Sequence, residues 1–189
     1  MDPSRISSED LISPDYLAEQ KRLHESGYGQ RGGKWSGAAR SIADRLGVKT
    51  ILDYGCGQAD LADKLIASGW PPERLWSYDP AVQAFANLPP AADLVMCTDV
   101  LEHVEPNRID RVLWHLRSLT KVALFTVISR VETAKTLSDG RQAHILLKPW
   151  NWWLDRFSAH GFELANDKQH ALFHNFKPEK QFVNLWGPT

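Results

Sequence analysis

Short apolar runs alternate along the chain with longer segments in which apolar positions recur every three or four residues. Such runs are typical of buried strands, and the recurring positions are typical of amphipathic helices. The predicted strands cover 50–54, 75–79, 93–99 and 122–128, with 162–165 and 171–176 as a closing antiparallel pair. The predicted helices cover 16–24, 37–46, 61–68, 107–119 and 150–160. This alternation predicts an α/β fold with a mostly parallel sheet and helices on both faces.

Local signals indicate where three of these helices begin or end. Ser13 before Pro14 predicts a capped start, because proline at the first helical position has no N–H that needs a partner. Asn107 is a candidate cap for the helix over 107–119. Gly47 is a candidate stop for the helix before the first strand.

Three tryptophans, Trp150, Trp152 and Trp153, lie together at the start of the last predicted helix. They could stack on a planar substrate or pack in the interior. Adjacent helical positions point about 100° apart, so at least one of Trp152 and Trp153 is expected in the core. We favour packing as their main role.

Composition narrows the class of protein. The chain has 189 residues, with 22 lysines and arginines against 23 aspartates and glutamates. This length fits one domain, and the near-neutral charge makes nucleic acid a less favoured partner than a small molecule. Cys56 and Cys97 match neither a disulfide framework nor a zinc motif. Residues 1–10 lack the features of a signal peptide, and no apolar run could span a membrane. We therefore expect a cytoplasmic protein without a membrane partner.

A glycine turn follows the first predicted strand, as Gly55-Cys56-Gly57. A strand, a glycine turn and a helix present backbone N–H groups to a ligand, and glycine lets that ligand approach closely. Dinucleotide sites carry a third glycine in this turn, but here that position holds Asp60. A bulky anion there disfavours NAD or FAD, so a cofactor without phosphates fits better.

Asp79 ends the second predicted strand, 22 residues after Gly57. An acid at this place can accept hydrogen bonds from ribose hydroxyls. Both features fall at the carboxyl ends of adjacent strands, where open α/β sheets bind ligands. The alternative, a plain tight turn and an exposed aspartate, is less favoured.

The sequence around these residues resembles the class I S-adenosylmethionine-dependent methyltransferases. Residues 51–57 match their first motif, residues 78–80 the second, and residues 93–104 the fourth strand and the segment after it. The resemblance covers about 45–165 and implies a Rossmann-like, doubly wound sheet with S-adenosylmethionine as the cofactor. It implies nine cofactor-binding residues: Asp53, Tyr54, Gly55, Cys56, Gly57, Asp79, Pro80, Thr98 and Asp99.

The chain departs from this family between the second and third predicted strands. The family fits a helix, a third strand and an acid that contacts adenine into this interval, which here is only 81–92. Pro89 and Pro90 disfavour a strand there. We therefore expect the family's third strand to be missing or vestigial, and leave the adenine contact unassigned. Residues 1–36 are expected to form a helix and loop over the cofactor site, with 37–189 as the methyltransferase core.

A second constellation follows the strand over 93–99. Asp99, Glu102 and His103 are spaced to share one side of a helical turn, and His144 could reach the same sheet edge. The set resembles the metal site of the small-RNA 3′-terminal 2′-O-methyltransferases and the ubiquinone-biosynthesis O-methyltransferases. It could hold Mg²⁺ or Mn²⁺. Alternatively His144, with His103 and Glu102, could act without a metal as the acid–base group, or Glu102 and His103 could only stabilise a turn.

These observations together predict a methyltransferase, with oxygen on a small molecule or a sugar as the expected acceptor. Two alternatives stay open: a 2′-O-methyltransferase acting on nucleic acid, and an inactive partner subunit that binds S-adenosylmethionine. An oxidoreductase on the same fold is disfavoured, because Asp60 stands in the turn and there is no second nucleotide-binding half. The sequence does not specify an oligomeric state.

Overall fold

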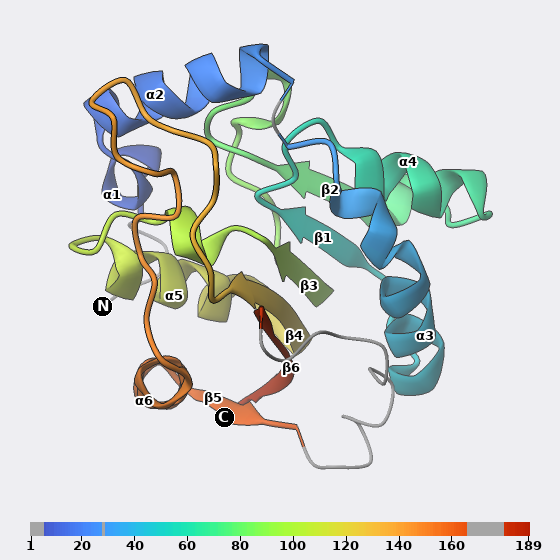
Figure 1. Cartoon of the computed structure of the whole chain (residues 1–189). Helices are drawn as coiled ribbons and strands as arrows, with labels where there is room; N and C mark the ends of the chain where they lie inside the picture. Colours follow the sequence, from blue (N-terminus) through green and yellow to red (C-terminus); the bar gives the residue numbers. More distant parts are fainter. Residues whose placement is uncertain (1–5, 28, 166–179) are drawn as a thin grey trace.

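The computed structural model describes residues 6–27, 29–165 and 180–189. Its strands form one six-stranded sheet in the order β2-β1-β3-β4-β6-β5 (Figure 1). Strands β1 to β4 are parallel to one another, and β6 runs antiparallel to both β4 and β5. The strand bounds are β1 Ile51–Tyr54, β2 Leu75–Tyr78, β3 Ala92–Thr98, β4 Thr120–Ser129, β5 Phe162–Leu164 and β6 Gln181–Pro188.

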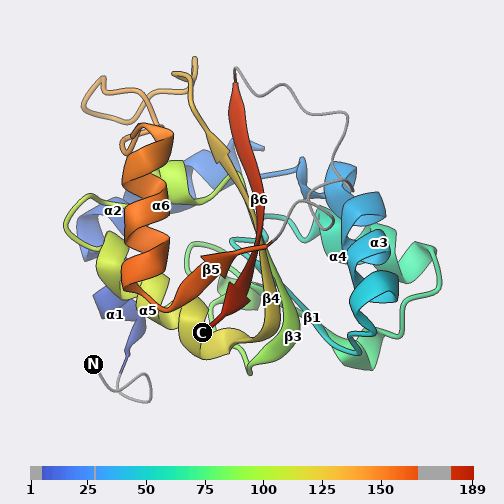
Figure 2. The same cartoon turned by 90° about the horizontal axis from the view of Figure 1, so that it is seen from below.

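Two layers of helices cover the sheet, which Figure 2 shows edge-on. One apolar core joins α1, α5 and α6 to the sheet, and the other joins α3 and α4 to its opposite face. The remaining helix, α2, lies across the carboxyl ends of the parallel strands. The helix bounds are α1 Ser8–Leu11, α2 Pro14–Glu25, α3 Ser36–Leu46, α4 Asp60–Ala67, α5 Ile109–Leu119 and α6 Trp150–Ala159.

The order in which the chain adds strands to the sheet reverses between β1 and β3. From β1 the chain moves outward to β2, and from β3 it moves the other way to β4. Two neighbouring strands whose connections leave in opposite directions open a crevice at their carboxyl ends, which is where ligands bind in such sheets. The loops after β1 and β3 are therefore the place to look for a site.

Most sequence-based expectations for the fold are confirmed. Ser13 accepts a hydrogen bond from the Tyr16 N–H at the start of α2, and Gly47 ends α3 in the left-handed region. Between β2 and β3 the structure has a 3₁₀ turn over Gln83–Phe85, and β3 pairs directly with β1. Among the described residues, no strand lies outside β2, as the short 81–92 interval predicts.

The start of α5 corrects one prediction. Asn107 does not cap this helix, because α5 begins at Ile109 with Arg108 in the cap position and no side-chain hydrogen bond. The Arg108 N–H donates to the Glu105 carbonyl at 2.9 Å. This turn places Asn107 one residue before the N-terminal cap position of α5.

The antiparallel end of the sheet was only partly predicted. β5 lies where a strand was expected, and its partner is β6, which the sequence pattern did not predict. The other expected strand, over 171–176, lies outside the described residues.

The tryptophan prediction is confirmed. Trp153 is fully buried and packs near Phe157, which stacks on Trp186 with ring centroids 4.1 Å apart. Trp152 is only partly buried, and the cations of Lys148 and Arg156 lie over its ring.

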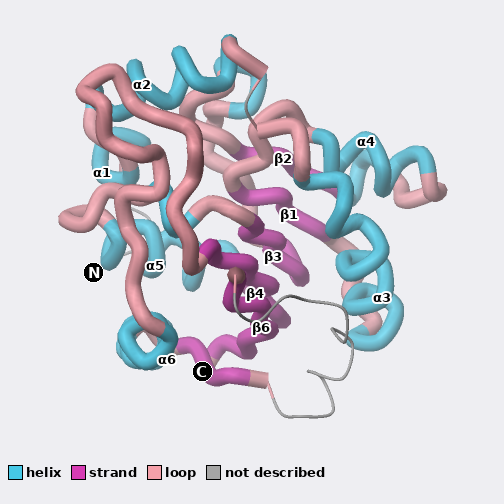
Figure 3. Tube along the Cα trace, viewed as in Figure 1, coloured by secondary structure: helices cyan, strands magenta, loops and turns pink. Residues whose placement is uncertain are grey.

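None of the helices in the described part of the chain combines the length and apolar character that crossing a membrane requires. Figure 3 shows the division of the molecule into helix, strand and loop, with long loops crowded over the carboxyl ends of the strands.

Candidate active site

The turn after β1 depends on two glycines in the left-handed backbone region. Gly55 has a φ of 74° and Gly57 a φ of 53°. A methyl group on Gly55 would collide with the Val100 side chain, and one on Gly57 with the Gly29 carbonyl. Only glycine lets the turn pass this close to its neighbours. The Gly55 N–H donates to the Tyr78 carbonyl at 2.7 Å, which ties the turn to the end of β2.

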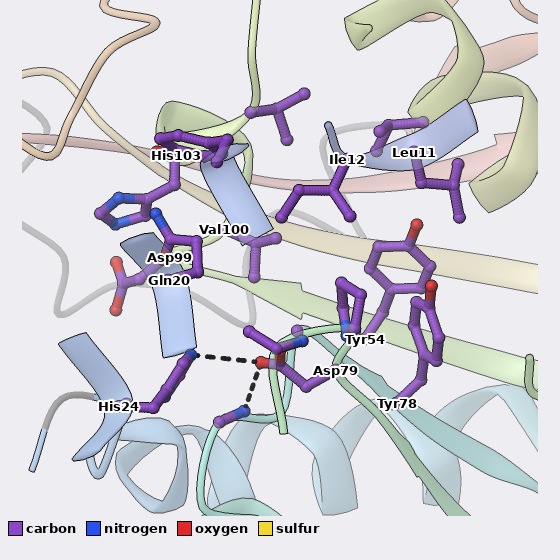
Figure 4. A pocket seen from close by; sticks show the side chains of 18 of the residues that line it. Leu11, Ile12, Gln20, His24, Tyr54, Tyr78, Asp79, Asp99, Val100 and His103 are labelled. Atoms are coloured by element: carbon purple, nitrogen blue, oxygen red, sulfur yellow. Dashed lines mark hydrogen bonds and ion pairs between the residues drawn. The ribbon is translucent and has the colours of Figure 1, made fainter. Parts of the chain in front are cut away.

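Asp79 follows β2 and is held against this turn. Its buried carboxylate accepts a hydrogen bond from the Gly57 N–H at 3.0 Å and another from the Ala81 N–H at 2.9 Å. The His24 Nε2 atom lies 3.8 Å from the same carboxylate, and Figure 4 shows His24 reaching it from α2. The acid is therefore fixed in position at the carboxyl end of β2.

Asp53 lies inside the sheet, one residue before the end of β1. Burial, together with the charges of Asp79 and Asp60, raises the pKa of Asp53 to about 7. Its Oδ2 atom has no hydrogen-bond partner within the described ranges. A cationic donor placed beside it would favour the ionised carboxylate and pair this oxygen.

Two cavities open at the carboxyl ends of β1 and β3. We call them the Asp79 cavity, of about 120 Å³, and the His144 cavity, of about 700 Å³, because each of these residues lines only one of them. They share four residues in their walls: Gly29, Gly55, Asp99 and His103. All nine residues expected at the cofactor line at least one cavity: Asp53, Tyr54, Gly55, Cys56, Gly57, Asp79, Pro80, Thr98 and Asp99.

Glu102, His103 and His144 meet in the wall of the His144 cavity. Each offers a ligand atom, and these atoms lie within 4.8 Å of one another. Glu102 is fully buried. One of its carboxylate oxygens accepts a hydrogen bond from the Ser129 N–H at 3.0 Å, and the other has no partner in the part of the chain that is described. The loop after β4 thus brings His144 to the pair after β3, as the sequence predicts.

Backbone carbonyls orient both imidazole rings. His103 Nδ1 lies 2.8 Å from the Ala143 carbonyl, and His144 Nδ1 lies 2.7 Å from the Val131 carbonyl. Because a carbonyl only accepts, each Nδ1 carries a proton, and Nε2 is the ring nitrogen that each residue presents for other contacts. Burial, and then the neighbouring His144, lower the pKa of His103 to about 4. His103 is therefore a neutral imidazole at neutral pH.

This donor set suits two kinds of chemistry. Two imidazoles and a carboxylate can hold a divalent cation, and ring N–H groups that donate to backbone carbonyls are the usual support for such ligands. An imidazole lone pair can equally accept a proton from a hydroxyl.

Asp99 is not one of the side chains whose ligand atoms lie within 4.8 Å of one another. The expected common face on one helical turn is wrong, because Asp99 has a φ of 57° and precedes the 3₁₀ turn over Leu101–His103. Its two carboxylate oxygens accept hydrogen bonds from Lys34 Nζ at 2.7 Å and Gln181 Nε2 at 2.8 Å. A role for Asp99 as a metal ligand remains a prediction.

The segment before β1 lies over the glycine turn. The Gln58 N–H donates to the Gly29 carbonyl at 3.1 Å, and the Gly33 N–H donates to the Asp60 carboxylate at 2.8 Å. Three side chains from this segment line the His144 cavity: Gln30, Arg31 and Lys34. Tyr28, expected in the same segment, lies outside the described residues. That residues 1–36 close over a cofactor remains a prediction.

The contribution of α2 to the wall of the Asp79 cavity was not predicted from the sequence. Tyr16, Gln20 and His24 all line the Asp79 cavity. Their spacing of four residues places them on one face of the helix. This polar stripe was the available signal, although nothing in the sequence tells which part of the sheet α2 covers.

Comparison with known proteins agrees with this geometry. A family model described as a methyltransferase domain matches residues 23–183. No curated protein sequence matches the chain. The solved structures described below are 12–15% identical to it, so they report on the fold alone.

Three solved structures illustrate this likeness. One is 1,6-didemethyltoxoflavin-N1-methyltransferase from Burkholderia thailandensis with S-adenosylhomocysteine bound, which is 15% identical with a TM-score of 0.61 over 95% of this chain and 92% of that one. Another is magnesium protoporphyrin IX methyltransferase from Synechocystis with bound S-adenosylmethionine, 14% identical with a TM-score of 0.55 over 94% and 86%.

The third comes from a complex of the Haloferax volcanii Trm112 methyltransferase activator with a methyltransferase, and is 12% identical with a TM-score of 0.61 over 90% and 97%. The match of the family model spans most of the sequence and includes the glycine turn, Asp79 and the Glu102–His103–His144 group. The chain belongs to the methyltransferase-domain family, and it shares its fold with methyltransferases solved with S-adenosylmethionine or S-adenosylhomocysteine bound.

Proposed function

We propose that this methyltransferase transfers a methyl group to a hydroxyl oxygen of a small molecule or a sugar. The observation that carries the proposal is the Glu102–His103–His144 group, whose ligand atoms lie within 4.8 Å of one another in a cavity shared with the glycine turn. Oxygen acceptors need a group that takes or polarises the hydroxyl proton, and this group offers both imidazole lone pairs and a carboxylate.

The cofactor end of the proposal rests on two acidic residues and the glycine turn. Asp79 would accept hydrogen bonds from the ribose hydroxyls, and the glycine turn would let the methionine part approach the backbone. The unpaired Oδ2 of Asp53 would accept from the amino group of that part. When bound, S-adenosylmethionine supplies a methyl group on a positively charged sulfur.

In the proposed reaction the acceptor oxygen forms a bond to the methyl carbon while the bond from that carbon to sulfur breaks. The hydroxyl proton passes to an imidazole Nε2, on His144 or on His103. Most of the rate enhancement would come from holding donor and acceptor in line. Residues Gln30, Arg31 and Lys34 would help to exclude water from the His144 cavity.

The same group fits a divalent cation. The second oxygen of Glu102 is buried and unpaired within the described ranges, and each of the two histidines offers a ring nitrogen within 4.8 Å of the other ligand atoms. We propose that Glu102, His103 and His144 would hold the ion, with Asp99 as a further candidate. When bound, such an ion lowers the pKa of a hydroxyl and fixes its orientation. Imidazole ligands favour Mn²⁺ or softer metals over Mg²⁺.

Three binding and activity measurements test the proposal. Calorimetry with S-adenosylhomocysteine should show saturable binding that Asp79→Ala abolishes and Asp63→Ala, an exposed acid on α4, leaves unchanged. Titration with Mn²⁺ should show binding that Glu102→Gln removes and the exposed Glu73→Gln retains. Transfer of labelled methyl to a panel of hydroxyl compounds should be lost in His144→Ala while the affinity for S-adenosylhomocysteine is kept.

The outcomes separate the alternatives. Binding of S-adenosylhomocysteine without transfer to any acceptor would favour an inactive partner subunit. Transfer to the 2′-hydroxyl of RNA, and not to small molecules, would replace the proposed acceptor class. Transfer that persists in both His144→Ala and His103→Ala would overturn the role of the imidazoles.

A further inference from the structure

The Asp79 cavity continues beyond the ribose-binding acid into a pocket closed by the N-terminal helices. Leu11 and Ile12 line it on one side, and Val100, from the loop after β3, lines it as well (Figure 4). Its volume of about 120 Å³ is several times the roughly 10–15 Å³ that one water molecule needs on the same measure. The pocket therefore has room for a ring system next to Asp79.

Helix α2 supplies the polar side chains of this pocket. His24 approaches Asp79, with its Nε2 atom 3.8 Å from the carboxylate. Gln20 lies on the same face one helical turn earlier, a rise of about 6 Å. A base attached to a ribose on Asp79 would enter the same cavity, whose wall includes Gln20.

Gln20 is a buried amide whose nitrogen is left unpaired. Its exposed fraction is only 8%, and its Nε2 atom has no hydrogen-bond partner in the ranges that the structure covers. The hydroxyl of Tyr16 lies beside this amide, but the two groups do not meet in the geometry of a hydrogen bond. A buried unpaired polar group costs free energy, so an apolar side chain would serve packing better. The amide is explained if a ligand supplies the missing partner.

We infer that Gln20 recognises the adenine base of the cofactor. A carboxamide both donates and accepts, so it can pair with the adenine amino group and an adjacent ring nitrogen at once. The apolar side chains of Leu11, Ile12 and Val100 would contact the faces of the ring. The residue thus takes the place of a contact for which the short segment between β2 and β3 offers no strand. This inference rests on the proposed cofactor site at Asp79.

The test compares two leucine substitutions on adjacent positions of α2. Gln20→Leu removes the amide from the pocket, whereas Lys21→Leu changes an exposed side chain that lines neither cavity. Calorimetry with S-adenosylhomocysteine should show an affinity about ten-fold to hundred-fold lower for Gln20→Leu and unchanged for Lys21→Leu. The melting temperature of unliganded Gln20→Leu should be equal to or above that of the wild type, because an unpaired buried amide has been removed.

Two analogues of S-adenosylhomocysteine, with carbon in place of adenine N1 or N7, show whether the lost contact is to the base. At least one should bind the wild type more weakly than S-adenosylhomocysteine does, with no further loss in Gln20→Leu. Equal binding of both analogues by the wild type, or wild-type affinity in Gln20→Leu, would overturn the inference. If the leucine variant does not fold, Gln20→Glu serves the same comparison. Failure of the wild type to bind S-adenosylhomocysteine would instead refute the proposed cofactor site.

Discussion

The Asp79 carboxylate accepts a hydrogen bond from the Gly57 N–H at 3.0 Å, which joins the end of β2 to the turn after β1. This bond holds the proposed ribose acid and the proposed methionine-binding turn in a fixed relation before any cofactor arrives. Binding then requires little rearrangement of these two elements, which reduces its entropic cost.

The raised pKa of Asp53 leads us to expect that cofactor affinity depends on pH near neutrality. Burial raises the pKa of Asp53 to about 7, and an ammonium group beside it would favour the ionised form. Below pH 7 the carboxyl must lose its proton before it pairs, so the affinity should fall about ten-fold per pH unit. Calorimetry with S-adenosylhomocysteine from pH 5.5 to 8.5, in buffers of different ionisation enthalpy, should show proton release that Asp53→Asn abolishes. A flat profile in the wild type would show that Asp53 does not face the ammonium group.

Substitutions at two glycines distinguish the stability cost of backbone strain from the cost of a steric clash. Gly57→Ala and Gly47→Ala both place alanine in the left-handed region, with φ values of 53° and 65°. The added methyl group meets nothing within 4 Å at Gly47 but collides with the Gly29 carbonyl at Gly57. Urea unfolding should show a loss of about 1 kcal/mol for Gly47→Ala and at least about 2 kcal/mol for Gly57→Ala, since overpacking adds to the strain. Equal losses would mean that the contact with Gly29 yields without cost.

Neighbouring tryptophans on α6 should differ in their effect on stability. Trp153 is fully buried in the core, whereas Trp152 is partly exposed. Trp153→Ala should lower the free energy of unfolding by about 3–5 kcal/mol. Trp152→Ala should cost no more than about 2 kcal/mol, from lost contact and lost cation–π attraction. A larger loss for Trp152→Ala would contradict the assignment of its neighbour as the core residue.

Features that depend on residues close together in the chain could be predicted from the sequence. The glycine turn, the strand-end acid Asp79 and the helix cap at Ser13 each depend on residues next to one another in the chain. That no strand of the described residues lies outside β2 also follows locally, from the length of the 81–92 interval and its prolines. The cluster of Glu102 and His103 with His144 was predicted because parallel strands bring their following loops to one edge.

Features set by tertiary packing were not predicted. Gln20 could not be connected with the site, because the sequence does not say which edge of the sheet α2 covers. The left-handed backbone at Asp99 depends on its place between β3 and the following 3₁₀ turn. β6 was not predicted, because it ends in Gly187 and Pro188, which local preference disfavours in a strand. Its pairing with β4 and β5 overrides that preference.

The most direct test of this account is the crystal structure of the complex with S-adenosylhomocysteine. We expect the ribose hydroxyls on Asp79, the amino group beside Asp53 and the sulfur atom facing the group of Glu102, His103 and His144. A ligand whose ribose lies away from Asp79, or whose sulfur faces away from that group, would contradict the proposed arrangement of cofactor and acceptor.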